Sequence, residues 1–168
     1  MCENAYQPKR LVDALEASDL DIIDVIINAL SDKLDLREIA EVRIELAERY
    51  LAEAREYINK GDAAQASEKL YKATKECIKA LAEILKLPEA GEARRSGRWF
   101  TWLLGSASVS IAEKLGKPEV AEAWALAYDA NVWGFHEMKY SIDKVAWRLK
   151  YIETLLAIAE NVIKGSRS

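Results

Sequence analysis

Two consecutive stretches of this sequence repeat one small and one large apolar residue every seven positions, and this pattern constrains the fold most. The repeat runs through residues 36–59 and again through residues 62–85. The small positions are Ala40, Ala47, Ala54, Ala66, Ala73 and Ala80, and the large or sulfur-containing ones are Ile44, Leu51, Ile58, Leu70, Cys77 and Ile84. A seven-residue apolar repeat predicts helices packed side by side, and alanine at one seam position lets the two backbones approach closely.

The four residues between these stretches carry the signals of a tight turn. Gly61 can adopt the left-handed conformation that ends a helix. Asp62 can accept the first free N–H groups of the next helix, and Gln65 follows three residues later, as in a capping box. The sequence therefore predicts an antiparallel helical hairpin over residues 36–85.

The remaining sequence predicts further helices around this hairpin. Residues 86–98 contain Pro88, Gly91 and Gly97 and are interpreted as irregular. Helices are expected at 98–115, after Pro118 and from about residue 142 to about residue 164. Gly134 is expected to bend the helix that follows Pro118. The predicted fold is all-α, an up-and-down helical bundle of four to five long helices occupying residues 36–165.

Residues 1–35 are expected to form an N-terminal helical extension of this bundle. Ser18 resembles an N-cap, and Asp21 stands three residues later, before apolar residues at helical spacing. A helix from about Asp19 to Lys33 follows from this pattern.

Charge and hydrophobicity argue against nucleic-acid-coating, secreted and membrane-spanning proteins. The formal net charge of −4 would repel phosphate backbones, which argues against a protein that coats nucleic acid non-specifically. Residues 1–10 lack the apolar core of a signal peptide, and no apolar run approaches the roughly 20 residues of a membrane span. We therefore expect a cytoplasmic protein.

Residue types that carry common chemistry are scarce. One histidine and two distant cysteines cannot build a zinc site of usual composition. No Glu is followed three residues later by His, as a di-metal helical bundle requires, and no glycine-rich phosphate loop is present. The sequence predicts no metal, no cofactor and no catalytic residue.

Two segments nevertheless contain candidates for ligand binding. The single histidine lies in an aromatic stretch, residues 131–137, where it is either a structural residue or one that binds a ligand or moves protons. Three arginines cluster in residues 94–98. The candidate ligand-binding residues are His136, Asn131, Trp133, Arg94, Arg95 and Arg98.

The sequence also resembles a known family. The segments LAERYLAEA (46–54) and GDAAQASEKLYKA (61–73), followed by Trp124 and WGFHE (133–137), resemble the archaeal PaREP family of the HEPN superfamily. The resemblance covers roughly residues 37–160. It implies a bundle that often pairs as a homodimer, nucleotide or RNA binding in some relatives, and metal-independent ribonuclease activity in others.

The nuclease relatives carry Arg, then four to six residues, then His. At this spacing before His136 the present sequence has Asn131, Ala130 and Asp129, so the arginine is missing. The chemistry needs a guanidinium to hold the scissile phosphate while the imidazole moves protons. We therefore expect a non-catalytic module that binds a partner protein or a nucleotide-type ligand, with RNA binding weakly supported, possibly as a homodimer. The alternative is a ribonuclease or nucleotidyl-transfer accessory protein that uses His136.

Overall fold

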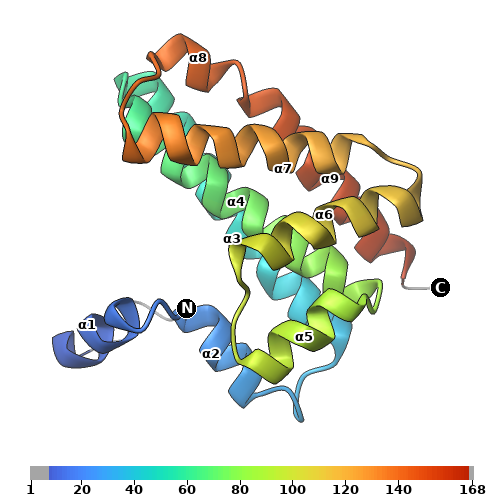
Figure 1. The fold of residues 1–168 in the computed structure, drawn as a ribbon. Helices are drawn as coiled ribbons and strands as arrows, with labels where there is room; N and C mark the ends of the chain where they lie inside the picture. Colours follow the sequence, from blue (N-terminus) through green and yellow to red (C-terminus); the bar gives the residue numbers. More distant parts are fainter. Residues whose placement is uncertain (1–7, 167–168) are drawn as a thin grey trace.

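The computed structural model describes residues 8–166, and every regular element in that range is helical (Figure 1). The elements are α1 (Lys9–Ala17), α2 (Ile22–Ala29), α3 (Leu36–Lys60), α4 (Ala63–Ile84), α5 (Pro88–Ser96), α6 (Thr101–Leu115), α7 (Glu119–Asp129), the π-helix η1 (Ala130–His136), α8 (Ile142–Ala146) and α9 (Leu149–Gly165). The all-α prediction is confirmed. In this part of the chain no helix is both long and apolar enough to cross a membrane.

The α3–α4 hairpin forms as its repeat predicts. Gly61 ends α3 with φ 75°, and the Asp62 carboxylate accepts the backbone N–H of Gln65 at 3.0 Å. Ala47 and Ala73 are 0% and 1% exposed, so the small seam positions lie where the two helices meet. The backbones approach closely because these positions carry no more than a methyl group.

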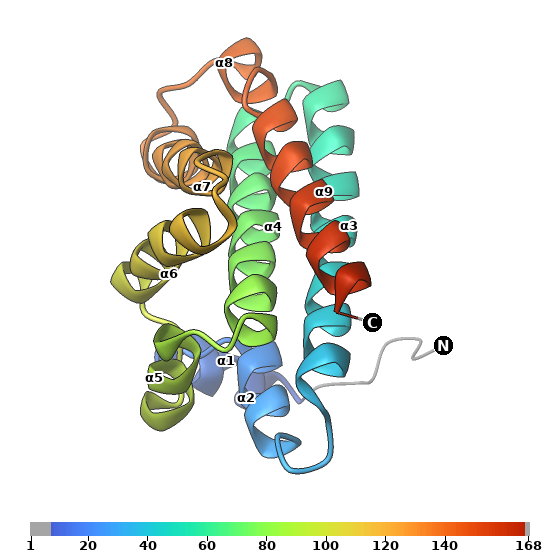
Figure 2. The same cartoon turned by 90° about the vertical axis from the view of Figure 1, so that its right-hand side faces the viewer.

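Helix α4 lies at the centre of the molecule. Fourteen of its 22 residues are buried, and it contacts α3, α9, α6, α7 and η1. Helices α3, α4 and α9 run side by side along the long axis, whereas α6 and α7 lie across α4 (Figure 2). The fold is therefore a bundle, but only part of it has the expected up-and-down arrangement.

The N-terminal extension differs from its predicted boundaries. Of the expected segment 1–35, residues 1–7 lie outside the described residues. Ser18 ends α1, and Asp21 caps α2 by accepting the N–H groups of Ile23 (2.8 Å) and Asp24 (3.2 Å). The expected helix from Asp19 is wrong because Asp19 adopts a left-handed conformation, φ 54°, which separates the two helices.

Three further segments also differ from expectation. Residues 88–96 form α5 rather than an irregular stretch, because Pro88 occupies the first turn, where its missing N–H is not needed. At Gly134 the chain forms a π-helix. The last predicted helix is divided into α8 and α9, with Trp147 and Arg148 between them.

Candidate ligand-binding site

A cavity of about 990 Å³ lies beside residues 71–79 of α4, between the N-terminal segment and the helices that cross α4. Its walls come from α1–α2, α4, the α5–α6 connection, α6, α7 and the start of η1. The lining includes aromatic, basic and amide side chains at Tyr71, Lys75, Lys79, Arg98, Trp99, Phe100, Trp102, Trp124, Tyr128 and Asn131, and four carboxylates at Glu16, Asp19, Asp21 and Asp24.

Aromatic rings form much of this cavity wall. Trp124 and Tyr128, one turn apart on α7, are stacked with ring centroids 6.0 Å apart. The centroid of the Tyr71 ring on α4 lies 5.8 Å from that of Trp124. Phe100 and Trp102 form a second stacked pair at 6.2 Å. Trp102 is 64% exposed, so one face of this pair remains available to a planar ligand.

Two cations lie against these rings. The Lys75 ammonium is 5.0 Å from the centre of the Tyr71 ring and forms no ion pair with any described residue. Burial, together with the neighbouring charge of Lys79, lowers the pKa of Lys75. The Arg98 guanidinium lies 4.1 Å from the centre of the Phe100 ring. An anionic group in the cavity would meet both cations beside an aromatic surface.

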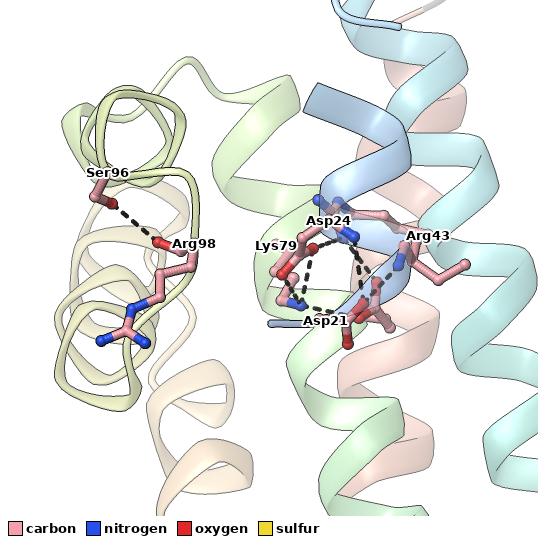
Figure 3. Close-up of polar contacts among 8 residues, drawn as sticks. Asp21, Asp24, Arg43, Lys79, Ser96 and Arg98 are labelled. Carbon is pink, nitrogen blue, oxygen red and sulfur yellow. Dashed lines mark hydrogen bonds and ion pairs between the residues drawn. The ribbon is translucent and has the colours of Figure 1, made fainter. Parts of the chain in front are cut away.

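Four buried charges form an ion cluster at the edge of the cavity (Figure 3). Asp24 of α2 bonds Arg43 of α3 at 2.9 Å and Lys79 of α4 at 2.9 Å, and Glu76 of α4 bonds the same two cations at 2.9 and 3.2 Å. Burial alone would lower the pKa of Lys79, but Glu76 and Asp24 together raise it. Two positive and two negative charges therefore compensate one another, and they join α2 to the α3–α4 hairpin.

The structure brings together two of the six sequence candidates. Asn131 and Arg98 both line the cavity. Arg94 pairs with Glu83 instead, and Arg95 forms an exposed pair with Glu92 at 2.7 Å. Figure 3 shows Arg98 on the α5–α6 connection, apart from the ion cluster.

The other two candidates, His136 and Trp133, lie on η1 and are exposed. They belong to the end of the molecule opposite α5, so the arginines of residues 94–98 do not fold over the histidine (Figure 1). The ring contact of His136 is with Phe135, at 4.9 Å between centroids.

Asp129 occupies one of the positions where nuclease relatives hold arginine. Its carboxylate forms an ion pair with Arg148 and accepts the Tyr140 hydroxyl at 2.8 Å. The Arg148 guanidinium also lies 4.5 Å from the centre of the Tyr140 ring. These contacts tie the end of α7 to the chain before α9, which is a structural role for all three side chains.

Sequence reasoning missed the residues of α4 and α7 that line the cavity. Tyr71, Lys75 and Lys79 are four residues apart and share one face of α4. Trp124 and Tyr128 have the same spacing on α7. The available signal was the spacing of Tyr71, Lys75 and Lys79, which places one aromatic and two cationic side chains along one face. The regular alanine repeat of the same helix made this signal hard to recognise.

Comparison with known proteins identifies the relatives of this chain. The sequence matches the archaeal PaREP1/PaREP8 family over residues 42–156. The fold matches the crystal structure of a protein from Sulfolobus solfataricus with a TM-score of 0.64 and 33% identity, over 70% of this chain and 95% of that one. No curated protein matches. This chain therefore belongs to the archaeal PaREP1/PaREP8 family.

Proposed function

We propose that this protein is a non-catalytic, HEPN-like helical module that binds a nucleotide-type ligand in the cavity beside α4. One observation carries the proposal: stacked aromatic rings and the unpaired Lys75 line the same cavity. Nucleotides combine a planar base with an anionic phosphate, and these two kinds of side chain complement the two parts.

The cavity offers a contact for each part of such a ligand. Its volume of about 990 Å³ is at the upper end of the range for small-molecule sites, roughly 300–1,000 Å³. The exposed Trp102 provides a face on which a base can stack. Lys75 and Arg98 provide charged donors for phosphate oxygens, and the Asn131 amide has a donor and an acceptor for a base edge.

Binding of ATP tests this function. The cavity contains three tryptophans, so we expect ATP to change the intrinsic fluorescence of the wild-type protein. Replacing Lys75 by Ala should weaken ATP binding by about tenfold or more, because a hydrogen bond to a charged group contributes about 1.5–3 kcal/mol.

Lys72→Ala is the matched control for Lys75→Ala. Lys72 lies on the same helix but pairs with Glu68 at 2.9 Å and does not line the cavity. ATP affinity should be unchanged in this variant. Equal loss in both variants would contradict the proposed function. So would the absence of ATP binding both by the wild type and by the double variant D19N/D21N, which removes two carboxylates that line the cavity.

The placement of His136 favours a module without catalysis over a ribonuclease. Among the described residues no arginine forms a hydrogen bond or ion pair with His136, and Asp129 is already bound to Arg148. We expect the purified protein to leave labelled RNA intact without added metal. Cleavage by the wild type that disappears in His136→Ala would instead support the ribonuclease alternative.

We also propose that the protein pairs with a second copy of itself. Large apolar side chains remain exposed near the η1–α8 end, including Trp133, Met138 and Trp147. Aromatic residues and methionine are enriched in interfaces. Sedimentation should show a dimer at tens of micromolar, and a monomer at that concentration would remove this part of the proposal.

A further inference from the structure

The negative and the positive charges that line the cavity come from different parts of the sequence. All four of its carboxylates come from the N-terminal segment, at Glu16, Asp19, Asp21 and Asp24. All three of its cations come from the rest of the chain, at Lys75, Lys79 and Arg98. The family match begins at residue 42, so the carboxylates lie before the matched region and the cations within it.

The carboxylates of the N-terminal segment face these cations. Asp24 bonds Lys79 in the buried cluster, and Asp19 lies 3.8 Å from Arg98. Burial alone would raise the pKa of Asp21, but Lys79, the N–H groups of α2 and Lys75 bring it below its ordinary value. The segment therefore places negative charge where the proposed ligand would place its phosphate.

The two helices of this segment are attached unequally. Asp24 and Ile27 of α2 are buried, so α2 is anchored on the hairpin by the ion cluster and one apolar side chain. Helix α1 has no buried residue. Because little apolar surface holds α1, it can separate from the cavity at a small cost in free energy while α2 stays in place.

We propose that residues 9–21, the flap, compete with the phosphate of a bound nucleotide for Lys75 and Arg98. This inference rests on the proposed function. The flap weakens binding of charged nucleotides because Asp19 must give up Arg98, and because the Asp21 carboxylate that lines the cavity repels the phosphate. A neutral nucleoside has no phosphate and does not meet this competition. The flap therefore lowers the affinity for charged nucleotides without lowering the affinity for neutral nucleosides.

The test compares two double variants of the full chain that remove the same number of charges. D19N/D21N removes two carboxylates that line the cavity, and asparagine at position 21 can still cap α2. D13N/D32N removes two exposed carboxylates of the same N-terminal region that do not line it. Circular dichroism melting checks that both variants fold.

Calorimetric titration with ATP and with adenosine separates the outcomes. For D19N/D21N we expect ATP affinity to rise by about two- to fivefold, because exposed charge pairs contribute only small free energies. Adenosine affinity should be unchanged. For D13N/D32N both affinities should equal those of the wild type. The ATP difference should shrink as salt is added, because salt screens these exposed charges.

Other results of these titrations would overturn the flap, or the flap together with the proposed nucleotide binding. Equal ATP affinity in the wild type and D19N/D21N would overturn the flap while leaving the proposed function intact. Equal tightening in D13N/D32N would overturn the flap and leave a general effect of net charge. Tighter adenosine binding in D19N/D21N would overturn it in favour of steric blocking. No ATP binding by any of the three proteins would overturn both proposals.

Discussion

Helices α3 and α4 take part in two buried contacts of opposite chemistry. Along their own seam they meet through alanines and larger apolar residues, including Ala47 and Ala73. At the end nearest α2 they meet through Arg43, Glu76 and Lys79, whose charges are completed by Asp24 of α2. Both contacts are almost fully hidden from solvent, yet one consists of apolar packing and the other of four ions.

This difference determines how each contact responds to change. In the apolar seam every atom contributes a small, roughly additive amount, so a substitution costs free energy in proportion to the misfit. In the ion cluster each charge is stabilised by the two charges of opposite sign. Removing one leaves a buried charge without compensation, which costs more than the pair contributes.

The largest expected effect is on the ion cluster. Arg43→Ala leaves Asp24 and Glu76 with Lys79 as their cation, and we expect the free energy of unfolding to fall by about 3–5 kcal/mol. Chemical denaturation measures this change. Arg55→Ala is the control, because Arg55 forms an exposed pair with Glu153 at 2.8 Å and should cost less than about 1 kcal/mol. Similar losses in both variants would show that the cluster is no more stabilising than a surface pair.

The apolar seam should respond more weakly. Ala47→Leu or Ala73→Leu overpacks a site with no free space and should lower the free energy of unfolding by roughly 1–3 kcal/mol. Thermal melting checks this result. Ala52→Leu changes an exposed position of the same helix α3 and should leave the midpoint nearly unchanged. Unchanged midpoints for the two buried variants would show that this seam tolerates larger side chains.

A third buried contact, between Gly134 of η1 and Ser67 of α4, extends this comparison to a site without charged side chains. A Cβ atom at Gly134 would lie 2.8 Å from the Cβ of Ser67 and would overlap its hydroxyl, because η1 lies directly on α4. Gly134→Ala should cost on the order of 1–2 kcal/mol. Ser67→Gly in the same chain should recover part of this loss. Gly165→Ala, where a Cβ meets no atom within 4 Å, is the neutral control.

The smallest expected effect is the pH dependence of α2 docking. The pKa of Asp21 is lowered in the folded protein, so its contribution to stability is present above the ordinary value of about 3.9 and is lost as pH falls through the lowered folded value. The stability difference between wild type and Asp21→Asn should therefore shrink as the pH is lowered from about 5 to about 3. Melting curves at several pH values measure it, and a constant difference would contradict this assignment.

Local signals in the sequence predicted the hairpin well and its surroundings less well. Gly61 and Asp62 end and begin helices through contacts within a few residues, so their roles follow from sequence alone. Pro88 and Ser18 carry signals that fit two outcomes: proline both interrupts and starts helices, and serine both caps them and follows them. The structure shows which outcome each residue takes: Pro88 begins α5 and Ser18 follows α1.

The candidate site was less predictable than the fold. Arg98 and Asn131 were identified as candidates and both line the cavity, but Trp133 and His136, further along η1, are exposed and do not line it. Residues 94–98 are close together in sequence, yet only Arg98 reaches the cavity, because Arg94 turns to Glu83 on α4. Neighbours along a chain do not have to share a surface once a helix turns them to different faces.

The sequence by itself determined that this chain is all-helical, that residues 36–85 form a hairpin, and which residues form its seam. These properties follow from periodicity and from capping, which depend on residues at most a few turns apart. Only the tertiary structure decided that Asp24 completes a buried cluster with Arg43 and Lys79, and that Trp102, Trp124 and Lys75 share one cavity. These groups come from helices far apart in sequence, and no local pattern records which faces of separate helices will meet.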